Sequence, residues 1–153
     1  MAGYTVMMTR KINGAWETPT DLEATFEGLF YYKCEGLNTK GEPRAYTEEY
    51  AEAEQLRIWL PENVTRKATD VVLQLLFKGS TRQTAFDAFA AYVSGKRVRF
   101  WDSVRKRQAE MYLSGAVEVS EEKLHGTTPY FIAKFPFTCL SGDTTVTEQI
   151  NTL

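Results

Sequence analysis

The chain lacks most of the side chains from which catalytic and metal centres are built. Its 153 residues include one His and two Cys. Cys34 and Cys139 stand far apart in the sequence, so with His125 they do not form the closely spaced ligand pattern of a zinc site. His125 lies in the Gly-containing segment Lys123–Thr127, where we expect an exposed turn. The sequence therefore predicts neither a metal centre nor a catalytic histidine.

Motifs of nucleotide and acyl chemistry are missing as well. The sequence contains no Gly-x-Ser-x-Gly, no P-loop and no Gly-x-Gly-x-x-Gly. These patterns expose a nucleophilic serine, cradle phosphates and bind dinucleotides, respectively. We therefore expect a protein without a catalytic site and without a cofactor.

The chain also lacks long apolar runs and a strong net charge. No window approaches 18 consecutive apolar residues, and Met1–Arg10 does not have the basic and apolar regions of a Sec signal. The net charge of −2 gives no global attraction to nucleic acid or to an anionic membrane. We expect no membrane partner, and two buried thiols in a reducing compartment, with a disulfide as the alternative.

Aromatic residues are abundant by contrast. Nine Phe and eight Tyr contribute to an aromatic content of 13%, which favours strands and interfaces over a helical bundle. The length suits one domain, and no repeat or linker divides residues 1–153. The sequence therefore predicts a single α+β domain that is mainly β.

Alternating and continuous apolar patterns predict most of the strands. The turn Asn13-Gly14 is a strong hairpin signal because both residues tolerate a positive φ. Gly28 is a candidate bulge within its strand. The expected strands are Tyr4–Ile12, Phe26–Cys34, the half-buried alternation Leu56/Ile58/Leu60, Val71–Phe77, Val98–Trp101, Ala109–Val119 and Pro129–Leu140.

One helix is predicted at Thr81–Ser94. Ser80 and Gln83 have the spacing of a capping box, and Gly95 can take the left-handed position after the helix. Apolar residues recur on one face at helical spacing, namely Phe86, Phe89, Ala90 and Val93. We expect this helix, at about residues 81–94, to pack on a β-sandwich or distorted barrel.

Residues 36–54 differ from the rest of the chain. Gly, Asn and Pro interrupt residues 36–43, and the following segment is acidic without a wide apolar stripe. A short helix is possible by propensity, but such a helix would have no buried face. We therefore expect a long, mobile loop or arm at about 36–54 that becomes ordered on assembly. The acidic residues after residue 45 are Glu48, Glu49, Glu52 and Glu54.

A basic cluster lies between residues 96 and 107. Basic residues interleaved with aromatics can bind single-stranded nucleic acid. The same pattern is produced by a hairpin turning at Asp102-Ser103 that places its cations toward solvent or a neighbouring subunit. A basic face and an acidic loop suit head-to-tail contact between copies, so nucleic acid is not the expected specific ligand. The subunit-interface candidates are Glu48, Glu49, Glu52, Arg97, Arg99, Trp101, Arg105 and Arg107.

From about residue 55 to 140, the order and character of the elements resemble the tail-tube and distal-tail family of bacteriophages and phage-like particles. The resemblance rests on Asp70–Gly79, the helical Phe86-x-x-Phe89-x-x-Tyr92, Gly95–Arg107 and Pro129–Phe137. It implies a helix packed on a β-sandwich, strands with an F/Y-x-D-x-x-R-like pattern, and an outward loop that bridges subunits or rings.

The resemblance also implies an assembly function. The chain would form a homo-oligomeric ring, a hexamer in the six-fold arrangement, through edge strands. It would contact other tail or baseplate proteins. It would belong to a virion, prophage or phage-like particle assembled in the bacterial cytoplasm. Tube, distal-tail, terminator and connector proteins share this architecture.

Two other functions stay open. Phe30, Tyr31, Tyr32 and Trp59 could line a cleft for a small molecule or glycan, although few polar residues accompany them. An enzyme would need a carboxylate pair such as Asp102 with Glu110 in a dry pocket. The assembly hypothesis needs neither arrangement.

Overall fold

The structure is a computed structural model that describes residues 5–42, 46–48, 57–59 and 66–152. The described residues form short helix α1 (Leu22–Thr25), longer helix α2 (Arg82–Val93) and a predominance of strands. The strands are β1 (Val6–Ile12), β2 (Ala15–Trp16), β3 (Thr20–Asp21), β4 (Leu29–Glu35), β5 (Tyr46–Glu48), β6 (Arg57–Trp59), β7 (Thr69–Lys78), β8 (Arg97–Asp102), β9 (Arg107–Leu113), β10 (Glu118–Val119), β11 (Lys123–His125), β12 (Thr128–Cys139) and β13 (Thr145–Val146). The α+β, mainly β prediction is confirmed.

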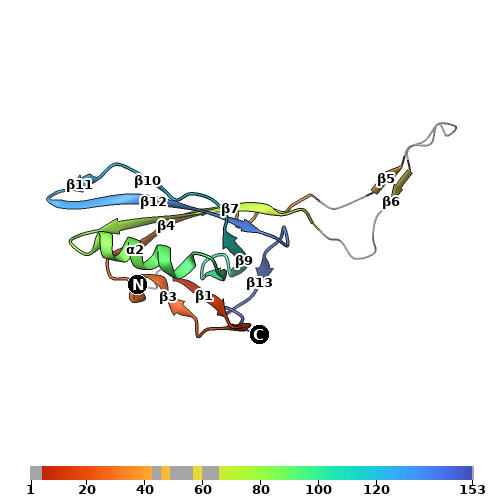
Figure 1. The fold of residues 1–153 in the computed structure, drawn as a ribbon, viewed down its shortest axis with the longest axis horizontal. Coiled ribbons are helices and arrows are strands. Elements are labelled where there is room, and N and C mark those ends of the chain that lie inside the picture. Colours follow the sequence, from red (N-terminus) through yellow and green to blue (C-terminus); the bar gives the residue numbers. More distant parts are fainter. Residues whose placement is uncertain (1–4, 43–45, 49–56, 60–65, 153) are drawn as a thin grey trace.

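Strands β4, β7 and β12 form a long antiparallel layer (Figure 1). β7 and β12 are paired from Tyr130 opposite Lys78 to Cys139 opposite Thr69, and β10 and β11 pair along the other edge of β12. Side chains alternate between the two faces of a strand. The inner face is therefore made by a buried set, Val71, Leu73, Leu75, Phe77, Phe131, Ala133, Phe135, Phe137 and Cys139.

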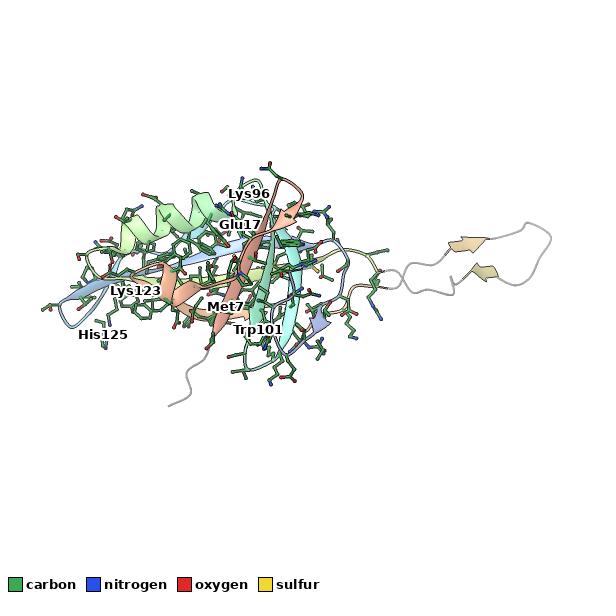
Figure 2. The ribbon with its side chains drawn as sticks, turned by 90° about the horizontal axis from the view of Figure 1, so that it is seen from below. Met7, Glu17, Lys96, Trp101, Lys123 and His125 are labelled. Atoms are coloured by element: carbon green, nitrogen blue, oxygen red, sulfur yellow. The ribbon has the colours of Figure 1, made fainter. Side chains whose placement is uncertain are left out.

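A second layer, β1, β8 and β9, covers this inner face. The sheet is continuous, because β9 joins β12 where Leu113 lies opposite Phe137. β1 and β8 cross the long strands steeply in Figure 2, so the folded-over sheet closes like a sandwich. Val6, Met8 and Phe100 are fully buried between the layers. The predicted sandwich-like architecture is confirmed.

Helix α2 packs on the inner face of the long layer. The ring of Phe89 meets that of Phe135 edge-on with centroids 4.9 Å apart, and Phe86 meets Phe77 at 5.5 Å. Phe89 and Val93 are buried as predicted, whereas Phe86 and Ala90 are only partly buried. The helix ends before Gly95, whose φ is +70°, as predicted.

The expected capping box of α2 does not form. Thr81 occupies the N-cap, and no side-chain capping hydrogen bond is present there. The Thr81 hydroxyl instead donates to the carbonyl of Glu27, 3.1 Å away. A tertiary partner therefore replaces the local one. Helix α1 was not predicted, although Asp21 caps it by accepting from the N–H groups of Glu23 and Ala24.

Two strand predictions need correction. The bulge lies between Tyr31 and Lys33, while Gly28 precedes β4 and lets the chain pass close to the carbonyl of Lys78. The expected strand Ala109–Val119 is broken after Leu113. There the N–H of Ser114 donates to the carbonyl of Pro136, beyond the last ladder pair of β9 with β12.

The expected loop at 36–54 contains a strand. β5 pairs with β6, with Tyr46 opposite Trp59, so part of the segment is neither loop nor helix. The pairing partner lies outside the segment, which is why local composition did not reveal it. Residues 43–45 and 49–54 lie outside the described residues, as do the side chains on which the expected half-burial of Leu56, Ile58 and Leu60 depends. The mobility of 36–54 stays a prediction.

Candidate assembly surfaces

The basic cluster forms the predicted hairpin of β8 and β9, here called the basic hairpin. Arg99 donates from Nε to Glu110 Oε1 at 3.1 Å, and its guanidinium lies 4.1 Å from the ring centre of Trp16. Arg97 Nη1 lies 3.6 Å from the other Glu110 oxygen and is half exposed. One carboxylate thus partly neutralises two of the interface candidates.

Residues of the C-terminal segment contact further side chains of the basic hairpin. The indole N–H of Trp101 donates to the carbonyl of Thr147 at 2.9 Å, and Arg107 Nη1 donates to Thr144 Oγ1 at 3.0 Å. Lys106 forms an ion pair with Glu148. Arg105 is exposed, although one of its nitrogens donates to the carbonyl of Cys34. Arg97, Arg105 and Lys106 are the exposed cations of the cluster, and of these Arg97 and Lys106 have a carboxylate partner.

The acidic interface candidates belong to a segment here called the arm, residues 43–65, which contains strands β5 and β6. Glu48 ends β5 opposite Arg57, while Glu49 and Glu52 lie outside the described residues. β5 and β6 stand away from the body that contains β9 (Figure 1). Within one chain, the structure does not bring Glu48 to the basic hairpin.

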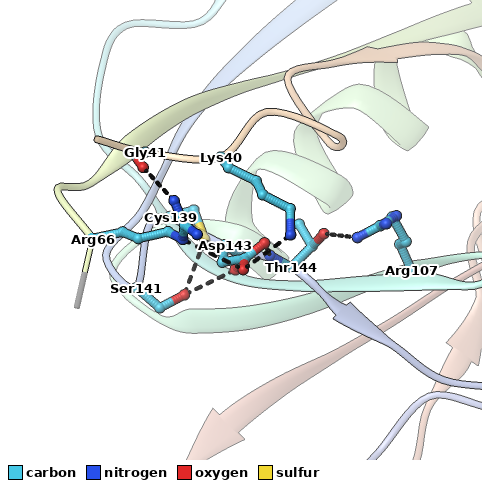
Figure 3. A network of polar contacts seen from close by, with 8 residues as sticks. All are labelled: Lys40, Gly41, Arg66, Arg107, Cys139, Ser141, Asp143 and Thr144. Atoms are coloured by element: carbon cyan, nitrogen blue, oxygen red, sulfur yellow. Dashed lines mark hydrogen bonds and ion pairs between the residues drawn. The ribbon is translucent and has the colours of Figure 1, made fainter. Parts of the chain in front are cut away.

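The described segments flanking the arm are tied to the C-terminal turn at the arm root (Figure 3), which consists of residues 40–42, 66–67 and 141–144. The N–H of Gly41 donates to the carbonyl of Gly142 at 2.7 Å, and the N–H of Lys67 donates to the carbonyl of Glu42 at 2.9 Å. A Cβ on Gly142 would lie 2.1 Å from the oxygen of Lys67. Glycine is therefore required for this close backbone approach.

Charge reinforces the arm root. The Asp143 carboxylate lies 3.7 Å from Arg66 Nε and 3.8 Å from Lys40 Nζ. Arg66 also donates to the carbonyl of Gly41 at 3.0 Å. The root joins segments that are distant in sequence. The dipeptide Ser141-Gly142 is a local turn signal that the sequence analysis did not use.

An open apolar groove lies on the outer face of the long layer and is here called the outer groove. Its volume is about 560 Å³. Phe30 and Tyr32 are 46% and 52% exposed, so the floor is accessible. The lining residues are Phe30, Tyr32, Leu76, Lys78, Lys123, His125, Tyr130 and Ile132. It combines aromatic and aliphatic surface with cationic or titratable nitrogens.

The structure assembles only part of the expected aromatic cleft. Phe30 and Tyr32 line the outer groove, but Tyr31 turns inward and stacks on Phe100 with centroids 6.0 Å apart. The bulge after Tyr31 shifts the register and so the facing of the next residues. The side chain of Trp59 lies outside the described part.

Asp102 and Glu110 do not form a carboxylate pair. Asp102 lies opposite Arg107, whereas Glu110 lies opposite Arg99 further along the hairpin. Asp102 is fully buried and accepts the N–H of Val104 at 2.8 Å, so it caps the hairpin turn. These two carboxylates have structural partners.

The His and Cys side chains are separate. His125 is exposed at the end of β11, as expected. Cys34 and Cys139 are buried free thiols, as expected, and the reducing compartment stays a prediction. Burial raises the pKa of the Cys34 thiol to about 12, against the opposing charge of Arg105. Within the described ranges, no three His, Cys, Asp or Glu residues are grouped to hold a metal ion, and no helix is long and apolar enough to cross a membrane.

Comparison with known proteins finds a structural relative. No protein-family model matches the chain, and no curated protein matches it in sequence. The fold is similar to the crystal structure of the phage SPP1 Dit protein (gp 19.1), described as a paradigm of the hub adsorption apparatus in phages that infect Gram-positive hosts. The TM-score is 0.57 at 11% identity, over 92% of this chain and 51% of Dit. The chain thus spans about half the length of Dit and shares a fold with part of it.

Proposed function

We propose that this chain is a structural, self-assembling component of a phage tail or phage-like particle. The observation that carries the proposal is the fold shared with Dit along 92% of the chain. It functions as one domain, residues 1–153, without catalysis or cofactor. Its partners are copies of itself and other tail or baseplate proteins. Its place is the virion or prophage-derived particle, after assembly in the bacterial cytoplasm.

Surface features support association. Phe30, Tyr32 and Leu124 are large apolar residues that are 46%, 52% and 70% exposed. Exposed apolar surface of this kind on a sheet favours contact with another protein. Strands β5 and β6 stand away from the body and extend the reach of the subunit (Figure 1). A heterologous contact repeated with a closing rotation gives a ring, and a hexamer is the ring we propose.

Sedimentation velocity at rising protein concentration tests this proposal. We expect a monomer at low concentration and one discrete larger species at high concentration, seen as rings by negative-stain electron microscopy. Single-stranded DNA in the same experiment is expected not to co-sediment at physiological salt. A strict monomer at all concentrations would contradict the assembly function.

A binding module is the second candidate, favoured by the outer groove. Its volume of about 560 Å³ falls within the range of ligand pockets, and Phe30 and Tyr32 offer stacking surfaces. A glycan or small-molecule array screened by tryptophan and tyrosine fluorescence tests this function. Saturable binding by a strictly monomeric chain would favour the module over the assembly subunit.

A further inference from the structure

One row of side chains in the outer groove is cationic. Tyr130 of β12 lies opposite Lys78 of β7 on one side and opposite Lys123 of β11 on the other. All three side chains line the groove, so they form one row across three strands. Adjacent strands lie about 4.8 Å apart, which puts the backbones of the two lysines roughly 10 Å from each other. Because lysine side chains are long and flexible, both ammonium groups can reach one anionic group between them.

The neighbouring row is apolar. Leu76 of β7 lies opposite Ile132 of β12 and opposite Phe30 of β4, and all three line the groove. Leu76 and Ile132 stand two positions along their strands from Lys78 and Tyr130, a separation of about 7 Å. Phe30 is 46% exposed, so this row is accessible from solvent. A ligand that covers both rows therefore needs an anionic group about 7 Å from an apolar face.

The two lysines have no acidic partner among the residues that the structure describes. Within that part of the chain, Lys78 and Lys123 form no ion pair, and the groove lining contains no carboxylate. Glu122, which precedes Lys123, is paired with Arg82 instead. An incoming anion would therefore not have to displace a carboxylate from either lysine.

The next hollow on the same face of the sheet is balanced in charge. It shares Tyr32 and Ile132 with the outer groove, but its lining contains two lysines and two glutamates. One of the glutamates, Glu35, lies 3.1 Å from Lys33 Nζ and accepts a hydrogen bond from Gln74. Of these two neighbouring hollows, the outer groove is thus the one with an excess of positive charge.

The shape of the groove favours a ligand with one apolar face and a polar rim. The groove is open, with a volume of about 560 Å³, and its floor includes the exposed rings of Phe30 and Tyr32. A wholly apolar ligand would leave much of its surface in water there. A sugar ring can rest its C–H face on aromatic carbons while its hydroxyl groups stay solvated or bond to polar side chains of the lining.

We propose that the outer groove binds an anionic sugar, an inference that rests on the binding-module function given above and names its ligand class. The sugar ring lies on the apolar row, and its carboxylate or phosphate group lies on the cationic row between Lys78 and Lys123. Neither row includes a residue of the basic hairpin or of the arm. The site is therefore separate from the surfaces considered for subunit contact.

Three matched ligands test the ligand class. The para-nitrophenyl β-glucoside is neutral, whereas the para-nitrophenyl β-glucuronide and the glucoside phosphorylated on its primary hydroxyl carry an acidic group on the same ring. Equilibrium dialysis followed by nitrophenyl absorbance measures binding whatever the association state of the protein. We expect each acidic ligand to bind about tenfold more tightly than the glucoside, because only the acidic ligands form ion pairs with the two lysines. The ratio of the two acidic ligands distinguishes a carboxylate from a phosphate ligand.

Substitutions in the two rows locate the site. Lys78→Gln with Lys123→Gln should remove the preference for acidic ligands and leave the affinity for the glucoside unchanged. Phe30→Ala should weaken all three ligands by a similar factor. A matched control, Lys11→Gln with Lys96→Gln, makes the same change of net charge outside the groove lining and should keep the preference. Circular dichroism and thermal unfolding establish that the variants are folded, and added salt should reduce the preference of the wild type through screening.

The outcomes separate this inference from the functions on which it builds. If the wild type binds the three ligands equally, or if the variant without Lys78 and Lys123 keeps the preference, the anionic class is wrong while a binding module still stands. If none of the three binds, the binding module fails and this inference fails with it. Self-association is measured separately by sedimentation. A preference for acidic ligands that is lost in the groove variant and kept in the control supports the inference.

Discussion

The inner and outer faces of the β4–β7–β12 layer are made by alternate residues of the same strands, and they differ in what covers them. Phe77 and Leu75 point inward, where α2 and the second layer bury them completely. Leu76 and Lys78 alternate with these two residues along β7, and their side chains line the outer groove. The contrast shows that one strand ladder can carry a packed face and an accessible face.

The two faces also differ in how much apolar side-chain surface stays exposed to solvent. A typical monomer exposes apolar residues singly, whereas the outer groove gathers them with two lysines. The inner face is stabilised by packing within the chain. The outer face keeps apolar surface that is open to solvent, and the following experiments compare packed with open positions.

Neighbouring truncations on β7 should separate the two faces most clearly. Phe77→Ala is expected to lower the free energy of unfolding by about 3–5 kcal/mol, because it leaves a cavity among Phe86, Phe131 and Phe135. Leu76→Ala, on the outer face, should cost about 1 kcal/mol. Urea denaturation of the monomer measures both values. Equal losses would remove the distinction between a packed and an open face.

Substituting alanine for two glycines with similar backbone angles should lower stability more in a packed turn than in an open one. Gly142 at the arm root and Gly126 beside the groove have φ of +68° and +65°, but of the two only Gly142 has neighbouring atoms within 4 Å of the position that a Cβ would take. Gly126→Ala should cost about 1–2 kcal/mol from the left-handed backbone alone. Gly142→Ala should cost about 1–3 kcal/mol more through the clash with Lys67.

Thermal or urea unfolding of these two variants gives the comparison directly. The Gly126 variant is the control, because it shares the backbone strain and lacks the clash. A Gly142 variant as stable as the Gly126 variant would show that the backbone of the arm root moves aside without a loss of unfolding free energy. The close backbone approach would then have no role in holding the arm.

Cys34 is buried on the inner side of β4, and the pH dependence of stability should report its apolar environment. Burial raises the pKa of its thiol to about 12 in the folded state, above the value of roughly 8.5 for an unfolded chain. The neutral thiol thus contributes stability that is complete below about pH 8.5 and declines as pH rises toward 12. Relative to Cys34→Ala, the wild type should lose about 1–2 kcal/mol between pH 7 and pH 10.

Urea denaturation of both proteins at pH 7, 8.5 and 10 measures this difference. The Ala variant corrects for every other group that titrates in the range, including Tyr92, whose pKa burial also raises. Parallel stability curves for the two proteins would show that water reaches Cys34. Solvent would then reach the inner face more readily than the burial of its side chains indicates.

Local pattern was sufficient for much of the fold. Alternation along Val71–Phe77 and Pro129–Leu140 correctly indicated long strands with an apolar face, and helical spacing indicated α2. The turn Asn13-Gly14 formed as predicted, with positive φ at both residues. These features depend on consecutive residues, so the sequence could reveal them.

The sequence was less informative about the sites. It identified the arm and the basic hairpin as charged segments, and it named Phe30 and Tyr32 among the aromatics that could line a cleft. It did not reveal that Glu110 and the C-terminal segment pair with the cations of the basic hairpin. It also did not reveal that Lys78 and Lys123 line one groove with Phe30. Such placements depend on strand order and register, which charge and composition do not specify.

The sequence by itself therefore determined the mainly β class, the packed helix and the inward residues, because periodicity sorts side chains by face within each element. Only the tertiary structure decided the cap of α2 at Thr81, the close approach of Gly142 to Lys67, and the outer groove. Each of these joins segments far apart in the chain. Their contacts exist only after the sheet has folded over, so no local pattern could encode them.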